Sequence, residues 1–305
     1  MKIGFVGAGR MGAPMVRRLA EAGHTVAALG RDDEKRSAIA ELGARPVASL
    51  AEVTAGADAV IVCVFTDEQV RRVCLDDGLL AAMPSGSVLV LHTTGSPSTA
   101  EALAEAGRAG GIAVVDAPVS GGPHDIAAGT VTVFAGGAEA AVQTVRPALS
   151  AYAEPVLHVG PTGSGQRVKL VNNTLFAAQI GIVAEAVRLA GRLGVDEATL
   201  LGALPHGSGT SRALTSIAAA GSADRFIAAV GEFVGKDVAV IRAHGITRQV
   251  ERQVFESGAT VVDATCPKVK KAQVLIERQA KHHKHLLLFG EREHPEDRKS
   301  TRLNS

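Results

Sequence analysis

The stretch "KIGFVGAGRMGAPMVRRLAEAG", residues 2–23, decides the fold of the first part of this chain. A short apolar run rich in β-formers leads into a glycine turn, and the residues after the turn have the apolar spacing of a helix. Gly7, Gly9 and Gly12 form the pattern G-x-G-x-x-G between strand and helix. Gly7 permits the turn, Gly9 lets a pyrophosphate approach the backbone, and Gly12 lets the helix pack closely on the strand. The stretch predicts a dinucleotide-binding turn, and a purely structural glycine turn is the alternative.

The residues after the second predicted strand bear on the choice of cofactor. "HTVAALG" ends at Gly30, and Arg31 follows directly. An acidic residue near this point would bind the ribose 2′-hydroxyl of NAD, whereas the planar fork of an arginine suits a 2′-phosphate. Asp32 and Asp33 come one step later, where they fit the N-cap of the next helix. The pattern favours NADP, with NAD as the alternative if Arg31 is only a solvated loop charge.

Further strands alternate with helical stretches along residues 57–137. The predicted strands lie in "ADAVIVCVF", "GSVLVLHTT", "GIAVVDAPVSGG" and "GTVTVFAGG". This alternation predicts an α/β fold with a Rossmann-type, doubly wound, mostly parallel sheet. Ligands of such sheets bind at the carboxyl ends of the strands, where "HTTGS" and "VSGG" lie. The predicted cofactor-binding residues in this domain are Gly7, Gly9, Arg10, Met11, Gly12, Arg31 and Thr94.

Composition and charge limit the classes of partner. The chain has 305 residues, 46% of them hydrophobic, which is typical of a globular protein of about two domains. Its net charge of +1 gives no electrostatic reason to expect nucleic acid or an anionic membrane as partner. No apolar run reaches the roughly 18 residues of a membrane span, and the N-terminus has no signal-peptide pattern. With three scattered cysteines, we expect a cytoplasmic protein without disulfides; a homo-oligomer is left open.

Three motifs together carry a resemblance to a known family. "GFVGAGRMGAPM", "DAPVSGGPHDIAAGTVTVFAGG" and "GPTGSGQRVKLVNN" occur in the order and spacing of the β-hydroxyacid dehydrogenases, of the 3-hydroxyisobutyrate dehydrogenase type. The resemblance covers about residues 1–238. It implies an enzyme that transfers a hydride between a nicotinamide cofactor and a small 3-hydroxy acid or its semialdehyde. The site residues that it implies are Lys169 as acid/base, Ser120, Gly121, Gly122 and Asn173 as substrate-binding residues, and Lys236 near the cofactor.

The chemistry of this reaction suits the residues of the third motif. The nicotinamide carries the hydride, so the protein must move a proton at the substrate oxygen and hold the carbonyl carbon near the ring. Lys169 and Asn173 are four residues apart and therefore share one face of a predicted helix. A lysine in a dry cleft has its pKa lowered toward neutrality, as a general acid/base requires. The helix, expected at about residues 169–193, is apolar around most of its circumference, which predicts burial.

After residue 238 a second resemblance replaces the first. "RAHG", "DATCP" and "HPE" match in order and spacing a middle segment of 4-hydroxy-3-methylbut-2-enyl diphosphate reductase, an iron–sulfur enzyme of isoprenoid biosynthesis. The resemblance implies that Cys266 is a vestigial ligand of a [4Fe–4S] cluster. It also implies that His244 and His294 bind diphosphate and that Glu296 lies on a proton path. That enzyme holds its cluster with three cysteines, and only Cys266 is present in this segment.

The chain thus divides into four expected parts. A dinucleotide-binding domain (1–160) is followed by a truncated all-helical substrate domain (161–238), a small α/β fragment (239–296) and a tail (297–305). The tail, "DRKSTRLNS", resembles translated sequencing adapter and is expected to be disordered. The hypothesis is a chimera whose main function is NADP-dependent hydroxyacid oxidoreduction on a small carboxylate, impaired by truncation. The alternatives are the diphosphate reductase and a non-catalytic dinucleotide-binding remnant.

Overall fold

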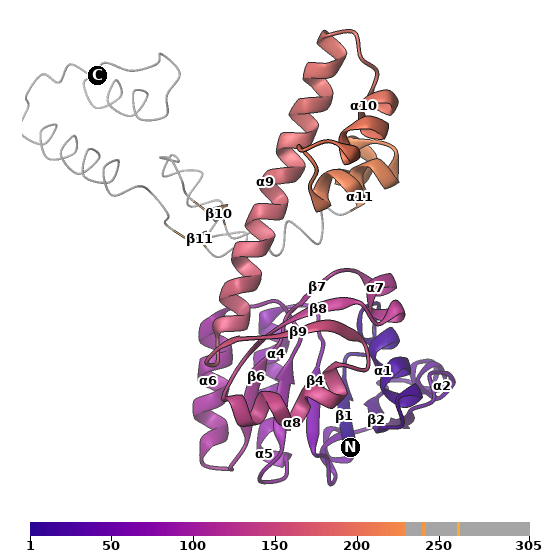
Figure 1. The fold of residues 1–305 in the computed structure, drawn as a ribbon. Coiled ribbons are helices and arrows are strands. Elements are labelled where there is room, and N and C mark those ends of the chain that lie inside the picture. Colours follow the sequence, from indigo (N-terminus) through magenta and orange to yellow (C-terminus); the bar gives the residue numbers. More distant parts are fainter. Residues whose placement is uncertain (230–239, 242–260, 263–305) are drawn as a thin grey trace, which may run out of the picture. The chain divides into compact units, whose positions relative to one another are not determined.

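The computed structural model describes residues 1–229, 240–241 and 261–262, and its ribbon is drawn in Figure 1. The chain divides into two compact units, Met1–Val171 and Asn172–Ser305. The division falls inside a helix, and therefore later than the boundary at residue 160 expected from the sequence, because one continuous helix begins in the first unit and continues in the second.

A mixed but mostly parallel sheet forms the centre of the first unit. Its strands are β1 (Lys2–Val6), β2 (Thr25–Leu29), β3 (Arg45–Val47), β4 (Ala59–Val62), β5 (Val88–Leu91), β6 (Ala113–Asp116), β7 (Val119–Ser120), β8 (Val131–Gly136) and β9 (Ala153–Gly160). The order is β3-β2-β1-β4-β5-β6-β8-β7, and β9 pairs with β8. Pairs from β3 to β6 are parallel, whereas β8 is antiparallel to β6 and β7. The predicted Rossmann-type sheet is confirmed, with an antiparallel element added at one edge.

Helices cover both faces of this sheet (Figure 1). They are α1 (Gly12–Glu21), α2 (Asp33–Glu41), α3 (Leu50–Thr54), α4 (Asp67–Arg71), the π-helical turn η1 (Arg72–Asp76), α5 (Leu79–Ala82), α6 (Pro97–Arg108), α7 (Pro123–Ala128) and α8 (Glu139–Leu149). Because strand side chains alternate, Phe5 faces one hydrophobic cluster, with α1 and α8, while Val6 faces the other, with α3 to α6. Strands buried on both faces explain the unbroken apolar runs of the sequence.

The second unit is mostly helical in the part that the structure describes. The helix α9 (Ser164–Arg192) begins in the first unit, and α10 (Glu197–Ala203), a 3₁₀ turn η2 (Leu204–His206) and α11 (Arg212–Ala220) follow it. Ile180, Val183, Leu201 and Leu214 share one buried cluster, which joins α9 to α10 and α11. Two short strands, β10 (Val240–Ile241) and β11 (Val261–Val262), pair in parallel.

One side of α9 is exposed, which the sequence did not predict. The expected burial of this helix is wrong, since its cluster with α10 and α11 covers only part of its circumference. The exposed apolar side chains of the helix and of its C-terminal flank are Val171, Leu175, Ile182, Leu189 and Leu193. An 18-residue window of α9 reaches a mean hydropathy of 1.3, so length and composition alone would allow the helix to cross a membrane. The core helix of a globular protein passes the same test.

Candidate functional site

The glycine turn after β1 has the geometry that a phosphate-binding turn requires. Gly7 has φ +100°, and a Cβ on it would overlap the carbonyl oxygen of Cys63. Gly12 is equally restricted, because a Cβ there would lie 2.9 Å from the Phe5 ring and against the Gly7 carbonyl oxygen. Gly9 differs, since no atom lies within 4 Å of the position of its Cβ. The turn is therefore closed toward the sheet at Gly7 and Gly12 and open at Gly9, where a pyrophosphate would approach.

The start of α1 is suited to an anion. No side chain caps this helix, and its first turn contains no acidic residue. The predicted cofactor residues of the turn take different places: Arg10 is exposed, while Met11 is the N-cap residue and packs against the hydrophobic cluster of the sheet. Backbone N–H groups and the helix dipole supply positive potential at this point, together with the exposed Arg10.

Arg31 is exposed at the carboxyl end of β2, and the two acidic residues beside it are engaged in α2. Asp32 is the N-cap of α2, and its carboxylate accepts a hydrogen bond from the Lys35 backbone N–H (2.7 Å). Asp33 forms an ion pair with Arg36 (2.5 Å). The acidic groups after β2 are thus occupied in holding the first turn of α2, as the sequence predicted for the N-cap.

The loop after β5 is held by hydrogen bonds from two sides. The Thr93 hydroxyl donates to the Val64 carbonyl (2.9 Å) and accepts from the Val64 N–H (3.0 Å), which ties the ends of β5 and β4 together. Asp67, in the first turn of α4, accepts from the Ser96 N–H (2.9 Å). Thr94, the predicted cofactor residue, is half-buried in this loop. The carboxyl ends of β4 and β5 are therefore rigidly linked where the sheet would meet a dinucleotide.

The predicted carboxylate-binding turn lies at β7 and the start of α7. Ser120 ends β7 and is half-buried. Gly121 has φ +139°, and a Cβ on it would lie 2.7 Å from an oxygen of Asp125. The Asp125 carboxylate accepts the Gly122 backbone N–H (2.7 Å). Gly122 thus uses its donor to shape the turn, and Ser120 and Gly121 remain as the groups that would meet a ligand.

Lys169 lies in the second turn of α9 and is almost fully buried, with 8% of its surface exposed. The first turn of this helix is fixed by Asp116, at the end of β6. Its two carboxylate oxygens accept the backbone N–H groups of Gly163 (2.6 Å) and Gln166 (2.8 Å). Burial raises the pKa of Asp116 to about 6, although the two N–H donors oppose this change. Sequence reasoning missed Asp116 and Gln166, and the acidic residue that ends a buried strand in "VVDAPVSGG" was the available signal.

A second buried polar pair joins β5 to the segment before β9. The His92 ring accepts at Nε2 from the Tyr152 hydroxyl (2.7 Å) and donates from Nδ1 to the Ala117 carbonyl (2.6 Å). Burial lowers the pKa of His92 to about 4, so the ring is neutral at pH 7 and carries its proton on Nδ1. Burial also raises the pKa of Tyr152. The pair satisfies two buried polar groups inside the sheet domain.

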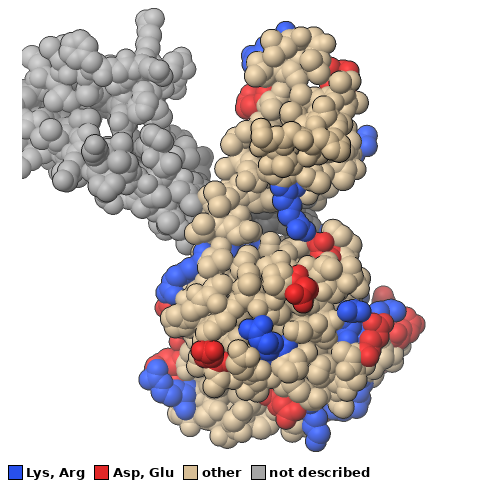
Figure 2. Space-filling view, viewed as in Figure 1, with Lys and Arg blue, Asp and Glu red and all other residues tan. Residues whose placement is uncertain are grey.

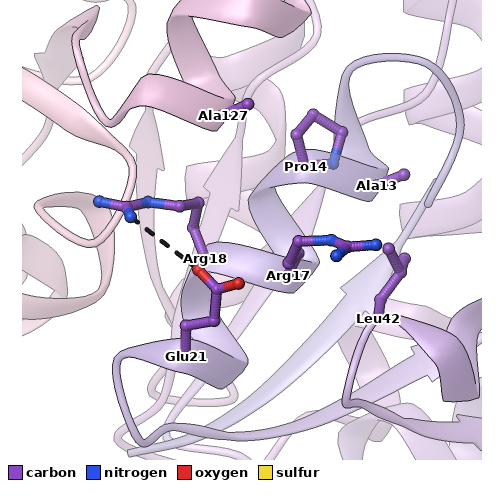
Figure 3. A pocket seen from close by; sticks show the side chains of 7 residues that line it. All are labelled: Ala13, Pro14, Arg17, Arg18, Glu21, Leu42 and Ala127. Carbon is purple, nitrogen blue, oxygen red and sulfur yellow. Dashed lines mark ion pairs between the residues drawn. The ribbon is translucent and has the colours of Figure 1, made fainter.

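A hollow of about 320 Å³ lies along the outer side of α1 (Figure 3). None of the predicted site residues lines it. Arg18 and Glu21, one turn apart on α1, form an ion pair at 3.9 Å beside it, while the Arg18 side chain also donates to the Ala151 carbonyl. Arg18 therefore has a structural role, and the hollow is separate from the glycine turn. Over the visible face of the sheet domain, basic and acidic residues are interspersed (Figure 2).

The remaining predicted residues belong to the second unit or lie outside the described residues. Asn173 lies on α9 in the second unit, one turn after Lys169. The residues outside the described part are Lys236, His244, Cys266, His294 and Glu296.

Comparison with known proteins identifies the chain. The NAD binding domain of 6-phosphogluconate dehydrogenase matches residues 2–160. The 2-(hydroxymethyl)glutarate dehydrogenase of Eubacterium barkeri is 34% identical over 236 residues, which are 77% of this chain and 76% of the relative. The 3-hydroxyisobutyrate dehydrogenase of Pseudomonas aeruginosa is 35% identical over 213 residues, 70% of this chain and 72% of the relative. The chain belongs to the β-hydroxyacid dehydrogenase family.

A solved structure agrees with this family at the level of the fold. The 3-hydroxyisobutyrate dehydrogenase of Mycobacterium tuberculosis, determined with L-serine, superposes with a TM-score of 0.69 and 29% identity, covering 92% of this chain and 94% of that one. As a β-hydroxyacid dehydrogenase, the chain is a nicotinamide-dependent oxidoreductase with a Rossmann domain, as the sequence predicted. The open backbone at Gly9 and the uncapped start of α1 fit such a cofactor.

A second family, the LytB protein, matches residues 177–301. The match supports the resemblance of the C-terminal segment to the diphosphate reductase, although it begins well before residue 239. The cysteines do not fit an iron–sulfur cluster. The chain has three cysteines, and only Cys266 lies in the matched segment, whereas a [4Fe–4S] cluster is usually held by four Cys thiolates. No step through a cluster is therefore derived for this chain.

Proposed function

We propose that this β-hydroxyacid dehydrogenase oxidises a small 3-hydroxy acid to its semialdehyde, or catalyses the reverse reduction, with NADP as the preferred cofactor. The burial of Lys169 at the carboxyl edge of the sheet carries this proposal. Lys169 is 8% exposed and lies in the second turn of α9, and its motif gives its side chain the role of a proton donor and acceptor.

The proposed division of labour follows from the chemistry. The nicotinamide, when bound, supplies or takes the hydride. Lys169 takes the proton from the substrate hydroxyl during oxidation and returns it during reduction. The Ser120 hydroxyl and the Gly121 backbone hold the substrate carboxylate, and Asn173 orients the hydroxyl group. Gly9 and the start of α1 hold the pyrophosphate, as the open backbone there supports.

The preference for NADP is supported by the residues after β2. The Asp32 carboxylate accepts the Lys35 backbone N–H and Asp33 pairs with Arg36, so both acidic groups already have partners within α2. Arg31 is exposed next to them and offers a guanidinium to a 2′-phosphate.

The test is turnover by the full chain with small 3-hydroxy acids and both cofactors. We expect Lys169→Ala to lower kcat by about 10²-fold or more while NADPH affinity, measured by fluorescence titration, stays the same. Lys2→Ala, at the exposed start of β1, is the matched control and should retain full turnover. Normal turnover by Lys169→Ala would remove this lysine from the mechanism. NADPH binding by the unchanged chain without turnover on any of the acids would favour the non-catalytic remnant.

A further inference from the structure

Gln166 is a buried residue that joins three separate elements. Its side chain is 2% exposed. The amide Nε2 donates to the Thr93 carbonyl (2.9 Å), and the amide Oε1 accepts from the Gly95 N–H (2.9 Å). These two bonds fix the orientation of the amide. Rotating it by half a turn would set Nε2 against the Gly95 N–H and Oε1 against the Thr93 carbonyl oxygen. The Gln166 side chain thereby fastens the loop after β5 to the first turn of α9.

The backbone of the same residue is bound to a third element. The Gln166 N–H donates to the carboxylate of Asp116, which is fully buried at the end of β6. Gly165, the residue before it, permits this approach, because a Cβ there would lie 2.5 Å from the Asp116 carbonyl oxygen. The first turn of α9 is therefore held against the ends of both β5 and β6.

This attachment determines where Lys169 lies. Gln166 and Lys169 are three residues apart, so they are neighbours on one side of the helix, separated by about 4.5 Å along its axis. The loop that Gln166 closes is itself tied to β4 through Thr93 and Val64. A displacement of the first helical turn would move the ammonium group relative to the strand ends, and an error of about 1 Å can cost on the order of 10²-fold in rate.

We propose that Gln166 is a positioning residue, which sets the place of Lys169 by fastening the first turn of α9 to the loop after β5. The inference rests on the proposed role of Lys169 in proton transfer. It concerns a geometric coupling, however, and this coupling can be measured without turnover.

The experiment is hydrogen exchange of the full chain, followed by mass spectrometry of peptides that cover the Gly95 loop and residues 167–170. Gln166→Met keeps the volume of the side chain and removes both side-chain hydrogen bonds. We expect exchange to become faster by roughly tenfold at the Gly95 loop and also at residues 167–170, as the loss of one or two net hydrogen bonds would produce. Exchange at Ile61 and Val90, inside the sheet, is the internal reference for global unfolding. Acceleration at Gly95 alone, with residues 167–170 unchanged, would overturn the proposal.

Two further variants keep the test decisive. Gln166→Glu retains the acceptor for the Gly95 N–H and loses the donor to the Thr93 carbonyl. Hydrogen exchange should therefore become faster at residues 167–170 and stay slow at Gly95. This variant replaces Gln166→Met if Gln166→Met does not fold. Arg167→Ala is the matched control, since it removes the surface ion pair with Glu101 from the same turn and should change neither peptide. Where turnover is measurable, Gln166→Met should lower kcat more than it changes KM. Lys169→Ala should leave exchange at Gly95 unchanged, so failure of the proton-transfer role and failure of the coupling give different results.

Discussion

At the scale of single residues, two acidic and two basic side chains after β2 have separate tasks. Asp32 and Asp33 bind within α2, and Arg36 donates to the Gly30 carbonyl as well as pairing with Asp33. Asp32 and Asp33 are exposed as well, but Arg31 is the exposed basic side chain of this group. The preference between NADP and NAD is therefore expected to depend on this one guanidinium.

We expect Arg31→Ala to weaken NADPH binding by about 1–3 kcal/mol while NADH binding changes little, because a charge-assisted contact to the 2′-phosphate is lost. Fluorescence titration with both cofactors measures the two affinities. Arg45→Ala, at the exposed start of β3, serves as control for a general loss of positive charge. Equal losses for both cofactors would argue against a 2′-phosphate contact.

Sequence reasoning located residues that follow a local rule and missed residues that depend on distant partners. The turn at Gly7, Gly9 and Gly12 can be predicted because the strand, the glycine spacing and the helix are adjacent in the chain. Asp116 and Gln166 could not be found in this way, since 50 residues separate the carboxylate from the N–H that it accepts. A sequence pattern predicts the element in which a residue lies. The contact between β6 and α9 forms only in the folded chain, so no local pattern predicts it.

At the scale of elements, α9 shows both a success and a failure of prediction. Its existence and approximate end follow from the apolar periodicity, but it begins at Ser164 rather than near residue 169. The first turn has glycine and polar residues, so no periodic signal marks it, and hydrogen bonds to Asp116 hold it in place. The apolar circumference predicted burial, yet the described helices cover only one side of α9.

Two glycines of α9 are expected to respond in opposite ways to alanine. A Cβ at Gly165 would lie 2.5 Å from the Asp116 carbonyl oxygen, so Gly165→Ala should lower the free energy of unfolding by about 1–3 kcal/mol. Gly181 has no atom within 4 Å of its Cβ position, so Gly181→Ala should raise helix stability by roughly 0.5–1 kcal/mol. Urea denaturation followed by circular dichroism measures both. A stabilising Gly165→Ala would contradict the close contact of α9 with β6.

At the scale of the whole molecule, two buried groups give opposite contributions to the dependence of stability on pH. The pKa of His92 falls to about 4 from 6.5, so between these values the unfolded chain holds more protons, and acidification destabilises the fold. The pKa of Asp116 rises to about 6 from 3.8, so between these values the folded chain holds more protons, and acidification stabilises the fold. From about pH 6 to about pH 4 the two contributions largely cancel.

Replacing either His92 or Asp116 should make the contribution of the other group to the pH dependence of stability measurable. As the pH is lowered from about 6 to about 4, the free energy of unfolding of Asp116→Asn should fall relative to the parent by up to about 1.4 kcal/mol for each pH unit. In His92→Gln it should rise relative to the parent by a similar amount over this range. Urea denaturation at several pH values measures the differences, and the double variant should return to the slope of the parent. Parallel curves for all four proteins would show that these groups do not titrate as their burial implies.

The exposed side of α9 has a consequence for the life of this protein in a cell. Leu175, Ile182 and Leu189 recur every seven residues and form a continuous apolar stripe on the helix. Chaperones and proteases recognise exposed apolar segments of this kind as marks of an unfinished chain, and marginal proteins are continuously sorted by them. The steady-state abundance of this chain would then be set less by how fast it is synthesised than by how quickly quality control removes it.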